Sequence, residues 1–203
     1  AMVDEMFDYG RFILNSKREN PSEDLLSAIA NAEIEGEKLS QEFLDGSWLL
    51  IIFAGNDTTR NTLSGGIKLL YDNQKQKELL INELELLPNF INETVRCVSP
   101  VIHMRRTTLE ETEINGQKIG PHEKIALWYG AANRDPEIFE NPDDFNILRE
   151  NADKHLAFGF GRHSCIGKPV ALMQLQEFYS QFLTRYPDFE MNGKWKVAPN
   201  NFV

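Results

Sequence analysis

Apolar residues in the first half of the chain recur at intervals of three and four, which is the period of amphipathic helices. The pattern predicts a helix over residues 4–18, a second helix after the breaker Asn20-Pro21-Ser22, and then an acidic loop at residues 33–38. Its longest stretch contains no proline and covers residues 40–72. It predicts one helix of about 33 residues, roughly 50 Å long, with Ser40 as its N-cap. A helix of this length is expected to run through the body of a protein.

The pattern changes after Pro100. Residues 101–130 combine Asn-Gly and Gly-Pro turn signals with β-type runs, which predicts short strands and hairpins. Residues 131–164 are rich in loop-forming dipeptides, and residues 188–203 suggest strand and turn. Beside the two early helices and the long one, three further helices are predicted, over residues 74–86, 88–98 and 168–185. The chain is therefore expected to be mainly α-helical with small β-hairpins.

Composition and charge exclude several classes of protein. The 203 residues include 31 acidic and 21 basic side chains, and the net charge of −10 argues against binding to nucleic acid or to anionic membranes. The longest apolar run, residues 48–54, is too short to span a bilayer, and the first residues carry no secretion signal. Two cysteines do not make a disulfide framework. We therefore expect a cytoplasmic protein with no membrane span and no nucleic-acid partner.

The first candidate for chemistry lies in the middle of the long predicted helix. Residues 55–59, Gly-Asn-Asp-Thr-Thr, are five poor helix formers in a row, and such conflicts between propensity and pattern tend to mark functional sites. Thr58 can bond back to the carbonyl of Ala54 and bend the helix. Asp57 and Thr58 offer a carboxylate and a hydroxyl for a proton relay. The alternative interpretation is an ordinary helix kink or an unrecognised loop.

A second candidate is a pair of opposite charges. Glu93 and Arg96 are three residues apart and would share one face of the helix predicted over residues 88–98. An arginine–carboxylate pair can be bidentate and can fix an orientation. The same spacing also fits an ordinary solvated surface pair, so on its own it decides nothing.

The third candidate is the glycine-rich segment 158–167, Phe-Gly-Phe-Gly-Arg-His-Ser-Cys-Ile-Gly. Its three glycines allow a backbone to fold tightly around a flat or bulky group. Cys165 precedes a predicted helix, whose first amides favour a thiolate over a thiol. A single thiolate in such a loop suits the axial ligand of haem iron, whereas zinc needs more ligands, and the spacing of His155 and His163 fits no zinc pattern. The alternative is a buried free cysteine beside a glycine turn.

Together the three motifs resemble those of the cytochrome P450 monooxygenases. Residues 158–167 resemble the haem-thiolate loop of that family, residues 54–59 resemble its oxygen-groove motif in the long central helix, and Glu93-x-x-Arg96 resembles its structural Glu–Arg pair. The order of the motifs along the chain also matches the family. The resemblance implies the C-terminal portion of the P450 fold: a long central helix, a helical pair, a β-rich segment, the cysteine loop and a final helix.

The resemblance implies which residues hold the cofactor, which in this family is haem b. Cys165 would be the proximal ligand of the iron. Arg106 and His163 would bind the haem propionates, with Arg105 as the weaker choice beside Arg106. The rest of the haem site would come from the two glycine-containing motifs: Phe158, Gly159, Gly161, Gly167, Ala54 and Gly55.

Other residues would serve the reaction or the fold. Asp57 and Thr58 would deliver the protons needed for the activation of dioxygen. Arg149 would join Glu93 and Arg96 as a third structural partner. The substrate side would be lined by apolar residues, each of which is otherwise most simply a core residue: Phe53, Val101, Ile102 and Phe202.

The implied function is that of a haem-thiolate monooxygenase, which inserts one oxygen atom from O2 into a small apolar substrate such as an alkyl chain or a sterol-like molecule. The chain contains no reductase sequence, so electrons derived from NAD(P)H would arrive through a ferredoxin-type partner and its reductase. An alternative of a different class is a non-catalytic haem-binding or interaction fragment of such a protein.

The family fold is much longer than this chain, so the resemblance implies a partial P450 domain over residues 1–203 that lacks the N-terminal half. We expect such a fragment to be inactive alone. A long helix with apolar residues on several faces needs more partners than 203 residues supply, which leaves self-association between copies open.

Overall fold

The structure, a computed structural model, describes residues 2–196 and divides into two compact units, residues 1–56 and 57–203. The division falls inside the long helix α3 (Gln41–Asp72). Before α3 the first unit contains two helices and one small antiparallel hairpin: α1 (Met2–Glu19), α2 (Leu25–Asn31), β1 (Glu33–Ile34) and β2 (Glu37–Lys38).

A small apolar core holds the first unit together. Leu14 of α1, Ala30 of α2 and two residues of α3, Leu44 and Trp48, are buried in it. The indole N–H of Trp48 donates to the carbonyl of Met6 at 3.0 Å, so this ring is held by a hydrogen bond as well as by packing. The first part of α3 is thereby fixed to α1 and α2.

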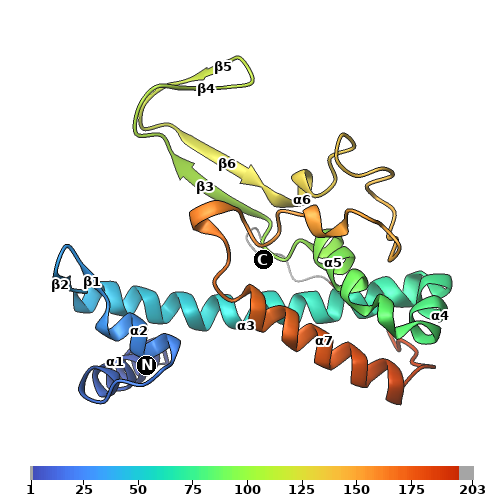
Figure 1. Cartoon of the computed structure of the whole chain (residues 1–203), viewed down its shortest axis with the longest axis horizontal. Coiled ribbons are helices and arrows are strands. Elements are labelled where there is room, and N and C mark those ends of the chain that lie inside the picture. The colour runs from blue at the N-terminus through green and yellow to red at the C-terminus, as the bar shows by residue number, and fades with distance from the viewer. Residues whose placement is uncertain (1, 197–203) are drawn as a thin grey trace. The chain divides into compact units, whose positions relative to one another are not determined.

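The second unit contains the rest of α3 followed by helices, short strands and long loops (Figure 1). Its remaining helices are α4 (Gln74–Asn82), α5 (Leu87–Val98), α6 (Tyr129–Ala132) and α7 (Lys168–Arg185). Three 3₁₀ turns are interspersed: η1 (Leu84–Leu86), η2 (Ala152–Lys154) and η3 (Gly161–His163). Its strands are β3 (His103–Thr107), β4 (Thr112–Ile114), β5 (Gln117–Ile119) and β6 (Lys124–Trp128).

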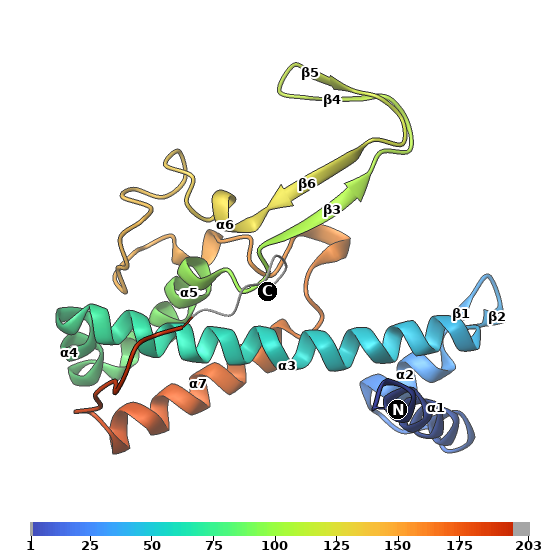
Figure 2. The same ribbon diagram turned by 180° about the vertical axis from the view of Figure 1, so that it is seen from behind.

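Helix α7 packs along the part of α3 that belongs to the second unit, as the two opposite views show (Figure 1, Figure 2). Tyr179 of α7 is fully buried, and its hydroxyl donates to the carbonyl of Leu63 in α3 at 2.7 Å. A Cβ atom at Gly66 would overlap this hydroxyl, so glycine permits the close approach. Phe90 of α5 meets the Tyr179 ring edge-on at 4.8 Å between centroids. Three helices therefore share one core.

The four strands of the second unit form two antiparallel ribbons. β3 pairs with β6, from His103 opposite Trp128 to Thr107 opposite Lys124, and β4 pairs with β5. Neighbouring residues of a strand point to opposite faces. Arg105 is accordingly exposed while Arg106 is half-buried, and this difference decides which arginine can reach the site described below.

The mainly helical architecture with small β-hairpins is confirmed. The long helix begins at Gln41 and ends at Asp72, and residues 54–59 remain helical despite their poor propensities. Within residues 2–196, no helix is long and apolar enough to cross a lipid bilayer.

Three local predictions were wrong. Residues 33–38, expected to be a loop, form the hairpin of β1 and β2. The helix predicted over residues 74–86 ends at Asn82, because Glu83 leaves the helical region with φ −132° and ψ 73°. The part of the predicted C-terminal strand that the structure describes, residues 188–196, contains no strand.

Candidate functional site

The glycine-rich residues 158–167, called here the Cys165 loop, make a tight turn before α7. Gly159 and Gly161 have φ angles of +71° and +63°, which residues with side chains rarely adopt. A Cβ atom at Gly159 would also lie 2.8 Å from the carbonyl oxygen of His163. The path of the loop therefore depends on glycine at position 159 for two separate reasons.

Cys165 closes this loop onto its own beginning. Its amide donates to the carbonyl of Phe158 at 2.8 Å, and its carbonyl accepts from the amide of Lys168, the first residue of α7, at 3.3 Å. The Cys165 side chain is exposed. The other cysteine, Cys97, is half-buried, and burial raises the pKa of its thiol to about 11. Of the two, Cys165 is therefore the one suited to bind an incoming metal centre as a thiolate.

A pocket of about 470 Å³ lies between the β3–β6 ribbon, α6 and the Cys165 loop. Arg106, Gly159 and His163, which the sequence assigned to the cofactor, all line it. A guanidinium and an imidazole can pair with carboxylates, and the aromatic side chains of Trp128 and Tyr129 on the same walls suit contact with a flat ring. These residues fit a planar group that carries carboxylates.

Trp128 and Tyr129 were not among the residues expected from the sequence. They lie where β6 ends and α6 begins. In the sequence they are only an aromatic pair at the end of a predicted strand, and nothing in that pattern places them opposite the Cys165 loop.

His155 supports the loop from inside the protein. Its side chain is buried, and burial lowers the pKa of the imidazole to about 4, with Lys168 lowering it further and Asp153 opposing the shift. The amide of Ala157 donates to Nδ1 at 3.3 Å, and the ring packs against Phe158 at 5.6 Å between centroids. A neutral ring in this place packs against the loop without bringing a buried charge.

Glu93, Arg96 and Arg149, called here the Glu93 cluster, form a buried ion network. The two carboxylate oxygens of Glu93 each accept from Arg96 at 2.8 Å and from Nε of Arg149 at 3.1 Å. Glu93 and Arg96 are fully buried, and Arg149 is nearly so. The interpretation of Glu93 and Arg96 as an ordinary solvated pair is therefore wrong.

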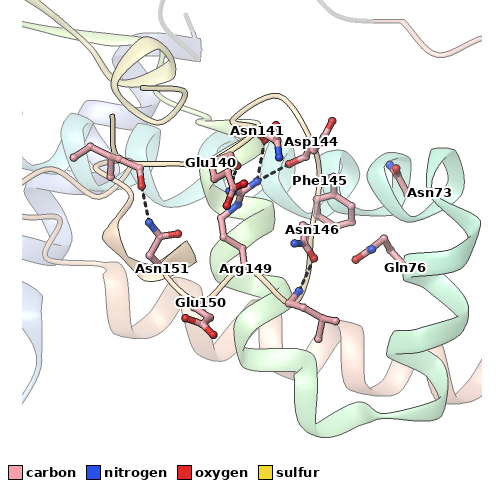
Figure 3. Close-up of a pocket in the computed structure, with 12 residues that line it drawn as sticks. Asn73, Gln76, Glu140, Asn141, Asp144, Phe145, Asn146, Arg149, Glu150 and Asn151 are labelled. Atoms are coloured by element: carbon pink, nitrogen blue, oxygen red, sulfur yellow. Dashed lines mark hydrogen bonds between the residues drawn. The ribbon is translucent and has the colours of Figure 1, made fainter. Parts of the chain in front are cut away.

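The remaining guanidinium donors of the Glu93 cluster hold the long loop that follows α6. Arg96 donates to the carbonyls of Asn133 at 2.8 Å and Pro142 at 2.7 Å. Arg149 donates to the carbonyl of Glu140 at 2.6 Å, and Figure 3 shows its side chain directed at this stretch of backbone. Hydrogen bonds from the Glu93 cluster thus hold this loop in place where the backbone hydrogen bonds of a helix or sheet are lacking.

A second hollow, of about 800 Å³, lies on the outer side of Arg149 (Figure 3). Three of its amide side chains are engaged by the chain itself: the Ile147 amide donates to Gln76, the Leu148 amide donates to the Asn146 side chain, and the Asn151 side chain donates to the carbonyl of Ile138. The acidic residues Glu140, Asp144 and Glu150 also line this hollow, and we assign no chemistry to it.

The residues of the oxygen-groove motif are distributed over both units. In the second unit, the Asp57 carboxylate makes a solvent-exposed pair with Arg60 at 2.6 Å, and the Thr58 carbonyl accepts from the Thr62 hydroxyl at 2.9 Å. Phe53, Ala54 and Gly55 belong to the first unit and are exposed there.

The other expected site residues are placed as follows. Val101 and Ile102 are half-buried just before β3. Gly167 is the N-cap of α7, and a Cβ atom there would be 3.8 Å from Cys165 Sγ, an ordinary contact. Phe202 lies outside the described residues. Over residues 2–196 no group of three His, Cys, Asp or Glu side chains is placed to hold a metal ion.

Comparison with known proteins agrees with this architecture, a mainly helical fold with a cysteine loop before its last helix. The sequence profile of the family described as Cytochrome P450 matches residues 1–200. The chain belongs to the cytochrome P450 family.

Among curated relatives, linalool 8-monooxygenase of Pseudomonas putida is 37% identical over 202 residues, covering 100% of this chain and 50% of the relative. Steroid C26-monooxygenase of Mycolicibacterium smegmatis is 36% identical, covering 97% of this chain and 49% of the relative. The chain spans about half the length of the curated relatives it matches.

Solved structures give the same result. CYP109E1 from Bacillus megaterium in complex with corticosterone is 35% identical with a TM-score of 0.85, covering 99% of this chain and 55% of that one. Cytochrome P450-153 from Novosphingobium aromaticivorans is 38% identical with a TM-score of 0.82, covering 91% and 46%.

Proposed function

We propose that the protein containing this chain is a haem-thiolate monooxygenase that inserts one oxygen atom from O2 into an apolar substrate. The observation that carries the proposal is the pocket that brings Arg106 and His163 together beside the loop presenting Cys165. We also take residues 1–203 as part of a single P450 domain. The same residues that make the pocket then account for cofactor binding.

Haem b is held in this proposal by residues of the second unit. Cys165 provides the thiolate ligand, and Arg106 and His163 pair with the propionates. Phe158 covers the sulfur side of the loop, and the glycines at 159, 161 and 167 leave room for a close backbone approach. Haem ligated by a thiolate supplies the oxidising chemistry, because the thiolate donates electron density that favours O–O cleavage.

Protons are supplied by α3. The Asp57 carboxylate, which pairs with Arg60 at the surface, takes up a proton, and Thr58 Oγ1 passes it on, because a hydroxyl can donate one hydrogen bond while it accepts another. Helix α3 is continuous through Asp57 and Thr58, so the two side chains keep the separation of adjacent residues in a helix.

The substrate is small and apolar, either an alkyl chain or a sterol-like molecule. Two kinds of relative support this class, since they are named for linalool and for steroid oxidation. Val101 and Ile102 are part of the apolar lining in this proposal. Electrons derived from NAD(P)H reach the protein through a ferredoxin-type donor and its reductase, in the cytoplasm.

The proposal is tested by adding haem to the purified chain and recording the absorbance spectrum of the reduced, CO-saturated form. A red-shifted Soret band of thiolate type is expected from the wild type and from Cys97→Ala, and its loss is expected in Cys165→Ala. Absence of haem uptake by the wild type, or an unchanged band in Cys165→Ala, would contradict the assignment. Haem uptake without turnover by the whole protein that contains this chain, when a ferredoxin system and a steroid or terpene are supplied, would favour the non-catalytic alternative.

A further inference from the structure

Asn133 is fully buried and is the chain neighbour of Ala132, which lines the 470 Å³ pocket. It follows directly after α6 (Tyr129–Ala132) in the chain. Every polar group of its backbone and both ends of its side-chain amide make a hydrogen bond, and these bonds lead to three different parts of the second unit.

Two of these bonds join opposite walls of the pocket. The Asn133 amide donates to the carbonyl of Tyr129 at 2.8 Å, which closes α6. The side-chain Oδ1 accepts from the amide of Leu156 at 2.6 Å. The carbonyl of Leu156 in turn accepts from the amide of Gly159 at 2.8 Å. Because Tyr129, Leu156 and Gly159 all line the pocket, Asn133 ties the α6 wall to the Cys165 loop.

The other bonds anchor Asn133 to the Glu93 cluster. Its carbonyl accepts from Arg96 at 2.8 Å, and its side-chain Nδ2 donates to the hydroxyl of Ser99 at 2.8 Å. The Ser99 hydroxyl donates to the carbonyl of Arg96, also at 2.8 Å. The three residues form a closed, buried ring of hydrogen bonds, so the side chain of Asn133 has one orientation in which both its oxygen and its nitrogen are satisfied.

We propose that Asn133 is a positioning residue for the haem ligand: it transmits the rigidity of the Glu93 cluster to the Cys165 loop and sets the distance between the two walls of the pocket. The inference rests on the proposed function, because the loop is taken to present an iron ligand. Asn133 acts on Cys165 indirectly, through Leu156, which lies two residues before the Cys165 loop, and Gly159, which lies within it.

The first test needs no haem and uses amide hydrogen exchange in the whole chain. In Asn133→Ala the amides of Leu156 and Gly159 should exchange about tenfold faster or more, because the bond to Oδ1 is lost and the loop opens locally. The matched control is Asn89→Ala, which removes two side-chain bonds, to the carbonyls of Ile147 and Arg149, at 2.7 and 3.0 Å. Equal exchange at Leu156 in Asn133→Ala and wild type would overturn the proposal.

Two milder variants keep the test decisive if Asn133→Ala fails to fold. Asn133→Asp retains the oxygen that accepts from Leu156, and slow exchange at this amide should be largely restored. Ser99→Ala removes the partner of Nδ2 and the bond to the Arg96 carbonyl but leaves Oδ1 unchanged, so Leu156 should stay protected. Fast exchange at Leu156 in both variants would contradict an action through Oδ1.

The second test distinguishes a positioning role from a general loss of stability. After haem addition, Asn133→Ala should show a several-fold smaller fraction of the thiolate-type Soret band with CO than Asn89→Ala at equal folded fraction. A wild type without this band would refute the proposed function. A wild type with the band, and equal fractions in the two variants, would refute the role of Asn133 alone.

Discussion

The Glu93 cluster and the Cys165 loop both concentrate polar groups, but they use them in opposite ways. In the cluster, Glu93 and both arginines are buried, and their donors and acceptors are taken up by one another or by backbone carbonyls. In the loop, Cys165 and His163 are exposed. Polar groups that are satisfied internally hold the backbone in place, whereas polar groups left at a pocket are available to a ligand. Substitutions in the Glu93 cluster and in the Cys165 loop should therefore have different effects on the protein.

The largest effect is expected for Glu93→Ala. The substitution leaves two buried guanidinium groups without their carboxylate, and breaking a buried pair in this way costs about 3–5 kcal/mol. Urea unfolding followed by circular dichroism measures the loss of stability. Asp72→Ala, which removes an exposed i,i+4 pair with Lys68, is the control and should cost about 0.5 kcal/mol or less. Equal losses in the two variants would show that the Glu93 cluster is not a scaffold.

The next effect is a dependence of stability on pH that arises from His155. Its pKa is about 4 in the folded chain against 6.5 in the unfolded chain, because burial disfavours the charged ring. Between these values the unfolded chain binds a proton that the folded chain does not, so stability should decrease as pH falls from 6.5 towards 4. The loss attributable to His155 is about 3 kcal/mol at its upper limit.

This dependence is measured by urea unfolding at a series of pH values. His155→Leu should flatten the decline between pH 6.5 and 4, whereas His122→Gln, at an exposed turn position, should leave the slope unchanged. An identical slope in wild type and His155→Leu would contradict the burial of a neutral imidazole beside the Cys165 loop.

A smaller effect separates two glycines of the Cys165 loop. Ala at either position must adopt a positive φ, which costs about 1–2 kcal/mol. At Gly159 the new Cβ also meets the carbonyl of His163, whereas at Gly161 nothing lies within 4 Å. Gly159→Ala should therefore be the more destabilising by about 1–2 kcal/mol. Comparison of melting temperatures of the two variants checks this, and a larger loss at Gly161 would show that the loop takes a different path.

The smallest effect is expected for Tyr179→Phe in the helical core. The ring contacts with Phe90 remain, and the hydroxyl donor shared between the carbonyls of Leu63 at 2.7 Å and Thr62 at 3.2 Å is lost, at a cost of about 1 kcal/mol. Tyr186→Phe, at an exposed position, serves as the control and should be neutral in the same unfolding measurement. A neutral Tyr179→Phe would mean that water replaces the hydroxyl between α3 and α7.

The elements that the sequence predicted best are those with long, regular patterns. The proline-free run gave the limits of α3 to within one residue, because packing and hydrogen bonding follow the apolar period there. The β1–β2 hairpin escaped prediction, since its four residues are exposed and show no apolar alternation. The end of α4 was missed because Glu83 and the leucines after it are good helix formers by themselves.

Only those features of the candidate site that depend on neighbouring residues in the sequence could be predicted. The glycines of the Cys165 loop are a local signal, and their positive φ angles follow from it. The choice between Arg105 and Arg106 depends on which face of the β3–β6 ribbon borders the pocket, and that is a tertiary property. Asn133 makes its decisive bond to Leu156, 23 residues away in sequence. The spacing of apolar residues along the chain gives no information about such a contact.

The unequal surroundings of the two sulfur atoms have a practical consequence. Cys97 is half-buried with a pKa raised to about 11, whereas Cys165 is exposed. Near neutral pH, an alkylating or fluorescent maleimide reagent should thus modify the wild-type chain at a single position. A probe can be attached to the Cys165 loop without any substitution, and protection of that position upon haem addition would report whether haem covers the sulfur of Cys165.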